Sequence, residues 1–463
     1  MEAEGRIAAL ETKVAELLAA LVERDARLGE QDARIAELEK LLEAAHRSGK
    51  RQAAPFSKGE PSDEPARPGR KKGKGHGRHG HRMAPADADR VLDAPLPQRC
   101  PHCGDGLDFE RWADQHQTEL PEMRPTVTRF RVGVGRCRGC KRRVQGRHRE
   151  QTSDALGAAG AQVGPRAMAW ATWLHYSLGL SFGKCSTLLA RLGVNVTAGA
   201  IASSSASTGT DLVPTHSAIV THVGSAPAVV MDETGWRIGG QGVWLWVAAT
   251  DDATVYDVAR GRGFDQATGL VPAAYTGVIV RDGWIVYNSY TKASHQTCTA
   301  HILRRCHEMM EDLPTWARGT PRQVRDLLLE ALGARDLDAK GRAAAAVDIG
   351  ERFDLLFEQA HPHDANRRLV KHLRHERHAL LTFLTTDGVD ATNWRGEQAV
   401  RPAVVNRKVW GGNRTDRGAE TQGRVMTFLR TAHQQGVDAI ELLVDLARAP
   451  NPGIVGELTL RSA

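Results

Sequence analysis

The sequence predicts a multidomain α/β protein, and three observations support this fold class. The chain has 463 residues, which is too long for one compact domain. Two short apolar runs, residues 228–231 and 277–281, have the length and composition of buried strands, and each is followed by an aspartate. Four cysteines form two C-x₂-C pairs well upstream of these runs, which indicates a separate small module.

Shifts in composition divide the chain into seven predicted segments. They are a leucine-zipper coiled coil (1–47), a basic flexible linker (48–89), a zinc ribbon (90–150), a helical segment (151–222), the first part of an α/β core (223–302), a helical insertion (303–390), and the second part of the core with C-terminal helices (391–463). No run reaches the ~18 apolar residues of a membrane helix. Acidic residues begin at Glu2 with no apolar stretch behind them, which argues against a signal peptide. We therefore expect a cytoplasmic protein without a membrane partner.

The first 47 residues carry a heptad repeat. Its six apolar a positions are Ile7, Val14, Leu21, Leu28, Ile35 and Leu42. Glu, Lys and Arg flank this seam, as they do at the e and g positions of coiled coils. The pattern favours an intermolecular zipper, and hence a homo-oligomer, over a long helix packed on its own domain, because no other long amphipathic seam lies nearby to receive it.

Basic residues dominate the linker that follows. The stretch 69–82 has no apolar side chain and cannot form a core. It serves in part as a solvated tether, but a flexible cationic arm also neutralises DNA phosphates, and the net charge of +7 agrees with a polyanionic partner. The candidate DNA contacts in this arm are Arg70, Lys71, Lys72, Lys74 and Arg78.

The two cysteine pairs predict a zinc ribbon. Cys100, Cys103, Cys137 and Cys140 are arranged as C-x₂-C, a gap of 33 residues, and C-x₂-C, a spacing that lets four thiolates reach one tetrahedral Zn²⁺. Four cysteine ligands leave no open position on the metal, so the site would be structural. Strands are expected in the gap, at 117–121 and 126–132.

Residues 164–210 are expected to be helical. Lys184–Leu192, a four-residue turn, and a helix capped by Thr197 fit a helix-turn-helix. A plain helical hairpin that covers the next domain fits about as well, because residues 197–208 contain no Arg or Lys to contact bases.

Three carboxylates on separate elements form the candidate chemical site. Asp232 and Asp282 follow the two apolar runs, and Glu397 lies in a stretch that we expect to make one or two helical turns before Pro402 ends them. Acidic oxygens of this kind hold Mg²⁺ ions, which keep water and substrate phosphates as further ligands. An aspartate at a strand end more often caps a turn, so each residue alone is a weak indication.

The segments between these carboxylates predict the fold of the core. Strands expected at 243–249 and 254–259, a helix at 264–270 and a fourth strand ending at Asp282 follow the order of a ribonuclease-H-like core. In that order the first and fourth strands are adjacent, which would bring Asp232 and Asp282 together. A helical insertion from Leu303 to about Leu384 would explain why Glu397 lies so far downstream.

The order of the modules and several strings resemble the DDE transposases of the insertion sequence 66 family. The strings are Asp232-Glu233-Thr234, Arg281-Asp282-Gly283-Trp284 with Tyr287-Asn288, Cys298-Thr299-Ala300-His301, and Asn393 through Arg401-Pro402 followed by Asn406-Arg407-Lys408. The resemblance implies a catalytic triad of Asp232, Asp282 and Glu397 with Mg²⁺ or Mn²⁺, and Zn²⁺ on the four cysteines. Nearby, Arg401, Arg407 and Lys408 would contact DNA phosphates or form a solvated basic face. For Cys298 and His301, a buried cysteine and a hydrogen-bonded histidine are favoured over a second zinc site.

The resemblance implies a bacterial transposase. Such a protein would bind double-stranded DNA at the terminal inverted repeats of its element and in the target, cut the ends and transfer them, in some elements with accessory proteins. It would lie in the cytoplasm, associated with the nucleoid when bound to DNA. Two other classes remain open: a catalytically inactive, dimeric DNA-binding protein derived from such an element, and a structure-specific nuclease. The zipper argues against the nuclease, because cleavage alone does not require paired DNA ends.

Overall fold

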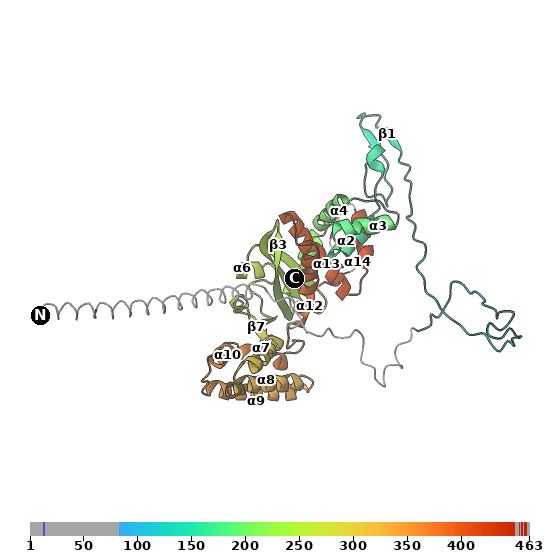
Figure 1. Ribbon diagram of the computed structural model, residues 1–463. Coiled ribbons are helices and arrows are strands. Elements are labelled where there is room, and N and C mark those ends of the chain that lie inside the picture. The colour runs from blue at the N-terminus through green and yellow to red at the C-terminus, as the bar shows by residue number, and fades with distance from the viewer. Residues whose placement is uncertain (1–12, 14–82, 450–452, 454, 457, 461–463) are drawn as a thin grey trace, which may run out of the picture. The chain divides into compact units, whose positions relative to one another are not determined.

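A computed structural model describes Lys13 and residues 83–449, 453, 455–456 and 458–460 (Figure 1). The chain divides into two units, Met1–Met83 and Ala84–Ala463. Apart from Lys13, the predicted zipper lies outside the described residues, as does the basic stretch from Arg70 to Arg78, so both stay predictions. The described part is a mixed α/β structure, and none of its helices is both long and apolar enough to cross a membrane.

A five-stranded mixed sheet forms the centre of the second unit. Its strands are β3 (Ala228–Ile238), β4 (Gln241–Ala249), β5 (Thr254–Ala259), β6 (Val278–Arg281) and β7 (Ser294–Thr297), in the order β5-β4-β3-β6-β7. Strand β4 pairs antiparallel with both β3 and β5, whereas β6 pairs parallel with β3 and β7 pairs parallel with β6. The predicted adjacency of the first and fourth strands is confirmed.

The prediction that the first strand ends at Asp232 is wrong. Strand β3 continues to Ile238, and Asp232 pairs with Val247 of β4. The antiparallel partner β4 supports β3 far beyond the point where the parallel partner β6 stops, and Trp236 and Ile238 are buried in the continuation. The polar residues after Met231 therefore interrupt the apolar pattern without ending the strand.

Helices make up most of the remaining described structure. They are η1 (Gly157–Gly160), α2 (Pro165–Tyr176), α3 (Phe182–Arg191), α4 (Ala198–Asp211), α5 (Val213–Gly224), α6 (Phe264–Ala267), η2 (Ile285–Ser289), α7 (Thr299–Asp312), η3 (Thr315–Ala317), α8 (Gly319–Ala334), α9 (Ala339–Glu358), α10 (Asp364–His375), η4 (Arg377–Ala379), α11 (Thr382–Thr385), α12 (Trp394–Trp410), α13 (Asp416–Gln434) and α14 (Ala439–Arg448).

Helix α13 covers the edge strand β5. The N–H groups of Thr254 and Tyr256 donate to the hydroxyls of Thr431 and Thr427, which lie one turn apart on α13. Exposed strand edges are templates for unwanted pairing. Side chains of α13 therefore satisfy two of the donors that β5 would otherwise leave open. Helix α12 packs beside it on β3 and β4.

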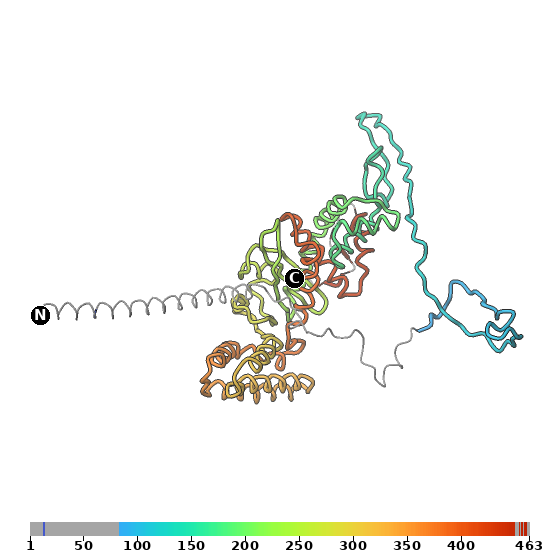
Figure 2. Tube along the Cα trace, in the orientation of Figure 1, coloured from blue at the N-terminus to red at the C-terminus, as the bar shows by residue number. Residues whose placement is uncertain are grey.

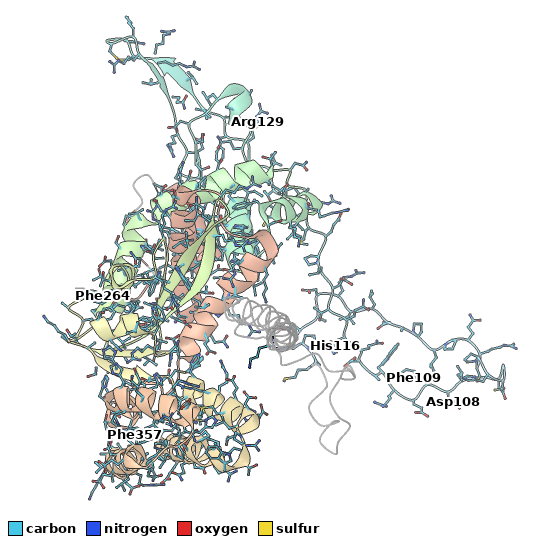
Figure 3. All side chains as sticks on the ribbon, turned by 60° about the vertical axis from the view of Figure 1, so that its left-hand side comes forward. Asp108, Phe109, His116, Arg129, Phe264 and Phe357 are labelled. Atoms are coloured by element: carbon cyan, nitrogen blue, oxygen red, sulfur yellow. The ribbon has the colours of Figure 1, made fainter. Side chains whose placement is uncertain are left out.

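Between β7 and α12 the chain leaves the sheet, forms α7 to α11 and returns (Figure 2). Helices thus occupy residues 303–384 for the most part, as predicted. Their buried apolar side chains form a second core, to which Val278 and Val280 of β6 contribute. Figure 3 labels Phe264, which packs against the hydrophobic core of the central sheet, and Phe357, which belongs to the core of the insertion. The insertion is therefore packed on the strand that leads to Asp282.

The segment before the sheet contains the predicted pair of helices, α3 and α4. The side chain of Thr197 caps α4, as the sequence indicated. One face of α4 is buried through Ile201, Ser205 and Gly209, and a Cβ on Gly209 would lie 3.0 Å from the side chain of Thr421 on α13. This packing against the core favours the helical hairpin over a helix-turn-helix.

The strands expected at 117–121 and 126–132 are wrong, because both stretches lack regular secondary structure. Two short antiparallel strands, β1 (Val134–Arg136) and β2 (Arg143–Gln145), flank the second cysteine pair instead. The composition of 126–132 indicated a strand, but a strand also needs a partner for its backbone and a core for its apolar face. Val127 has no such core, since it is 89% exposed.

Candidate active site

Parallel pairing of β3 with β6 places the two aspartates in corresponding positions. The register joins Val230 to Val280, so Asp232 and Asp282 each lie two residues beyond the last paired position. Asp282 follows the end of β6, and its Oδ1 accepts a hydrogen bond from the Trp284 N–H at 2.9 Å. Asp282, just after the carboxyl end of the short strand β6, thus lies beside Asp232 in the middle of the long strand β3.

Helix α12 brings Glu397 to the same place. Asn393 precedes the helix, and its carbonyl accepts the Glu397 N–H at 3.0 Å. Gly396 lies directly against β3: a Cβ at this position would lie 3.1 Å from the Cβ of Asp232 and 2.2 Å from Asn393 Oδ1. Only a residue without a Cβ permits this approach of the helix to the strand. The third carboxylate is therefore on the first turn of a helix that touches Asp232.

The prediction that Pro402 ends this helix is wrong, because α12 continues through it to Trp410. An interior proline costs about 3 kcal/mol, since it cannot donate the backbone hydrogen bond and crowds the preceding turn. Val400 and Val404 are buried in the core against the sheet. Burial of a valine contributes roughly 1.5–3 kcal/mol, so tertiary packing offsets the cost of the proline.

The carboxylates act on one another electrostatically. Burial raises the pKa of Asp232 well above its ordinary value, and the negative charges of Asp282, Glu233 and Glu397 raise it further. The Glu233 N–H, which donates to Asp232 Oδ1 at 2.8 Å, opposes this in part. A cation among these groups would relieve the repulsion. Within the described residues, however, no three His, Cys, Asp or Glu side chains are gathered closely enough to form a metal-binding group.

The Cys298–His301 motif lies beside the carboxylates. Cys298 is buried, its sulfur accepts the Asn393 N–H at 3.2 Å, and burial raises its pKa, which agrees with the favoured interpretation of a buried cysteine. His301, on the first turn of α7, has its Nε2 3.8 Å from Glu397 Oε1. In the described structure its Nδ1 and both polar side-chain atoms of Asn393 are buried without a hydrogen-bond partner. His301 and Asn393 were not predicted to belong to the site, although the C-x-x-H spacing was a signal for the histidine.

Glu233 links the two aspartate-bearing segments from the other face of β3. Successive strand residues point to opposite faces, so Glu233 and Asp232 diverge. The Arg262 guanidinium donates to Glu233 from its Nε at 2.8 Å and lies between two indoles, 4.4 Å from the ring centre of Trp244 and 3.8 Å from that of Trp284. Because the backbone N–H of Trp284 holds the carboxylate of Asp282, Arg262 connects β3 with the segment that follows β6. Arg262 was not predicted to take part in the site, since no local sequence pattern joins these residues.

The three basic residues predicted on α12 have different environments. Arg401 and Lys408 follow Glu397 by four and eleven residues, which places them about 40° and 20° from it around the helix axis. They therefore lie on the same face of α12 as Glu397, and both are exposed. Arg407 is half-buried and donates to the carbonyl of Gly235 in β3, and burial lowers its pKa. Two of the three can face DNA, whereas Arg407 attaches α12 to the sheet.

The structure brings the four cysteines together as two pairs. A backbone N–H of His102 chiefly lowers the pKa of Cys100, and that of Cys140 chiefly lowers the pKa of Cys137. Such turns stabilise the thiolate form, which is the form that binds zinc. The two pairs do not combine into one metal-binding group in the part of the chain that the structure describes. Zinc binding therefore stays a prediction.

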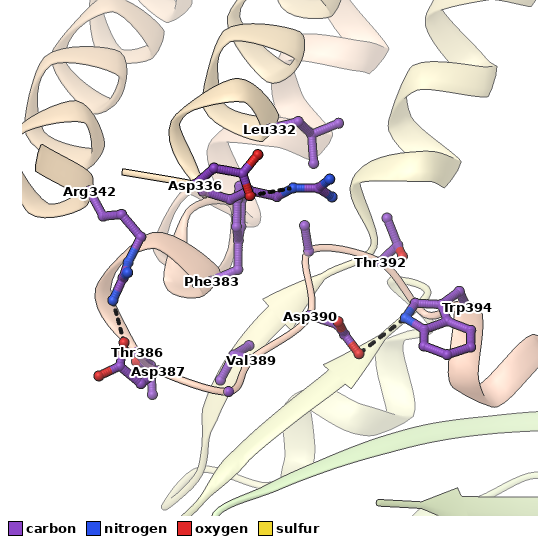
Figure 4. Close-up of a pocket in the computed structure, with 13 residues that line it drawn as sticks. Leu332, Asp336, Arg342, Phe383, Thr386, Asp387, Val389, Asp390, Thr392 and Trp394 are labelled. Atoms are coloured by element: carbon purple, nitrogen blue, oxygen red, sulfur yellow. Dashed lines mark hydrogen bonds and ion pairs between the residues drawn. The ribbon is translucent and has the colours of Figure 1, made fainter. Parts of the chain in front are cut away.

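A pocket lies between the insertion and the loop that leads into α12 (Figure 4). Its charged groups are largely paired with one another: Arg342 with Asp387, and Asp390 with the indole N–H of Trp394 at 3.1 Å. None of the three site carboxylates lines it. This pocket is therefore separate from the candidate active site.

Two comparisons with known proteins gave matches. Residues 160–421 match the model of the family described as "Transposase IS66 family", a range that includes all three carboxylates. The chain is also similar to "Uncharacterized protein y4qI" of Sinorhizobium fredii (strain NBRC 101917 / NGR234), with 24% identity over 314 residues that cover 60% of this chain and 58% of the relative. The match thus spans less than two thirds of that relative.

Proposed function

Because this chain belongs to the IS66 family of transposases, we propose that it cleaves and joins DNA with divalent metal ions held by Asp232, Asp282 and Glu397. The observation that carries the proposal is the convergence of these carboxylates from β3, the end of β6 and the first turn of α12. The strand order, with three antiparallel strands followed by two parallel ones, supports a ribonuclease-H-like core.

The donor set fits Mg²⁺ or Mn²⁺. Carboxylate oxygens are the ligands these ions prefer, and the crowding of negative charge that raises the pKa of Asp232 is what a divalent cation neutralises. The unpartnered side-chain amide of Asn393, next to Asp232 through Gly396, is a further polar group that such a site could use. When bound, the ions supply Lewis-acid activation of the phosphate and of a nucleophilic water or 3′-hydroxyl.

The chain's own residues would hold and orient this machinery. The Trp284 N–H directs Asp282, and His301 faces Glu397 from α7. Exposed Arg401 and Lys408 on the Glu397 face of α12 would contact phosphates near the cut. The linker residues Arg70 to Arg78 would add sequence-independent affinity. The zipper would join two chains, so that two ends of the element, together with any accessory proteins, could be held in one complex.

Cleavage of an element end by the full-length chain tests the proposal. The substrate is a duplex that carries the inverted repeats flanking the gene, and we expect nicks with free 3′-hydroxyls in Mg²⁺ or Mn²⁺. Removal of the metal with EDTA should abolish nicking and leave most of the binding, because affinity comes mainly from basic side chains. Specific binding of both ends without cleavage in either metal would instead identify an inactive DNA-binding derivative.

We also propose that Cys100, Cys103, Cys137 and Cys140 bind one structural Zn²⁺. The full-length chain should contain close to one zinc per chain by elemental analysis, and Cys103→Ser with Cys140→Ser should reduce this to near zero, because two thiolates hold zinc poorly. Cys185→Ala, which removes a buried cysteine of α3, is the control and should keep the metal. Full zinc content in the Cys103/Cys140 variant would contradict the assignment.

A further inference from the structure

The end of α10 is attached to the segment that carries Asp282. Arg281, the residue before that aspartate, is fully buried, and its Nη1 lies 2.8 Å from Glu376 Oε2, just after α10. His375 Nε2 lies 3.4 Å from Asn288 Nδ2 in η2. These contacts place one face of the helical insertion next to the candidate active site.

His372, one turn before Glu376, lies on the same segment. A Cβ on Gly283 would be 3.7 Å from its Cε1. Arg368 is four residues earlier on α10, and therefore on the same side of the helix. On α7, Arg305 lies four residues after His301, which faces Glu397. Two helices thus each present a histidine near the carboxylates and an arginine one turn further out.

The positive charge of Arg368 acts on Arg305. Burial chiefly lowers the pKa of Arg305, and the positive charge of Arg368 lowers it further. Within residues 83–449 neither guanidinium has a salt bridge or a side-chain hydrogen bond. Most other arginines of the insertion are paired, for example Arg342 with Asp387, Arg352 with Glu330, and Arg377 with Asp354. A few others, such as Arg322 on α8, also lack a carboxylate partner in the described structure, so Arg305 and Arg368 are distinguished by their place one turn from His301 and His372.

We propose that Arg305, Arg368 and His372, here called the basic insertion face, bind backbone phosphates of the DNA strand beside the scissile bond. The inference rests on the proposed function, because the carboxylates define where that bond lies. Four residues of an α-helix advance about 6 Å, and DNA advances about 3.4 Å per nucleotide along its axis. Arg305, one turn beyond His301, would then meet a phosphate roughly two nucleotides from the cut. A DNA phosphate supplies the anion that both guanidinium groups lack.

Salt dependence of DNA binding tests this face. In the full-length chain Arg305→Gln with Arg368→Gln removes two cations, and binding to an element-end duplex is measured by anisotropy over a range of KCl concentrations. We expect affinity to fall about 10-fold or more near 0.1 M salt, and the slope of log K against log salt to decrease by about 2. The lysine pair, Arg305→Lys with Arg368→Lys, should restore most of the slope, because the charge is retained.

Arg322→Gln with Lys340→Gln is the matched control. It removes two exposed cations from α8 and α9 of the same insertion, which also lack a salt bridge in the described structure. This variant should keep the parental slope. An unchanged slope in the Arg305/Arg368 variant, from a chain that cleaves normally, would overturn the inference and leave the proposed function standing. A parental chain that binds no duplex DNA would overturn both.

Discussion

Asp232→Asn, Asp282→Asn and Glu397→Gln should each reduce cleavage of element ends by at least about 10³-fold while binding is retained. Removal of one neutral donor to a developing negative charge already costs about 10²–10³ in rate, and a charged metal ligand contributes at least as much. Binding should persist because affinity depends on basic side chains, and loss of a carboxylate also lowers repulsion of the phosphates. Binding and nicking are measured on the same DNA fragment in Mg²⁺.

Glu420→Gln is the control for the third ligand. Glu420 is exposed on α13 and pairs with Arg424, one turn away, at 3.0 Å, so its loss should leave cleavage unchanged. If Glu397→Gln cut normally and Glu420→Gln did not, the third carboxylate would have been misassigned. Retained cleavage in either aspartate variant would contradict the proposed site, since Asp232 and Asp282 are both proposed as metal ligands.

Arg281→Met should destabilise the folded chain by about 3–5 kcal/mol. The substitution leaves Glu376 buried without its cation, and an uncompensated buried carboxylate is costly. Burial alone would raise the pKa of Glu376, but the Thr297 hydroxyl and Arg281 hold it below its ordinary value. In a folded unit of this size, Ala84–Ala463, the loss corresponds to a melting temperature lower by about 5 °C. Differential scanning fluorimetry of the full-length chain measures it.

The pH dependence of this loss has a definite sign. Without Arg281 the pKa of Glu376 in the folded state should rise above its value in the unfolded chain. The folded state then binds the extra proton, so the destabilisation should be largest at high pH and should shrink as the solution is made acidic. Arg352→Met, which removes an exposed pair with Glu330 and Asp348, is the control and should cost less than about 1 kcal/mol. Equal decreases in melting temperature in the two variants would show that the buried Arg281–Glu376 pair stabilises the fold no more than an exposed pair.

The carboxylates could be predicted because each follows a local pattern. Two apolar runs predicted β3 and β6, and the order of the strands predicted their adjacency, which places Asp232 and Asp282 together. His301, Asn393 and Arg262 could not be assigned in the same way. Each lies next to a residue that is distant in the sequence, as His301 lies next to Glu397, and no sequence periodicity links such positions.

The sequence by itself determined the family and most of the strands and helices, and it predicted the three candidate carboxylates, because apolar periodicity, strand ends and short motifs are local properties. Only the tertiary structure decided that β3 continues past Asp232 beside β4, that α12 continues through Pro402, and that Arg281 is buried against Glu376. In each case a packing surface supplied by a distant segment outweighs the local preference of the backbone or the cost of burying a charge.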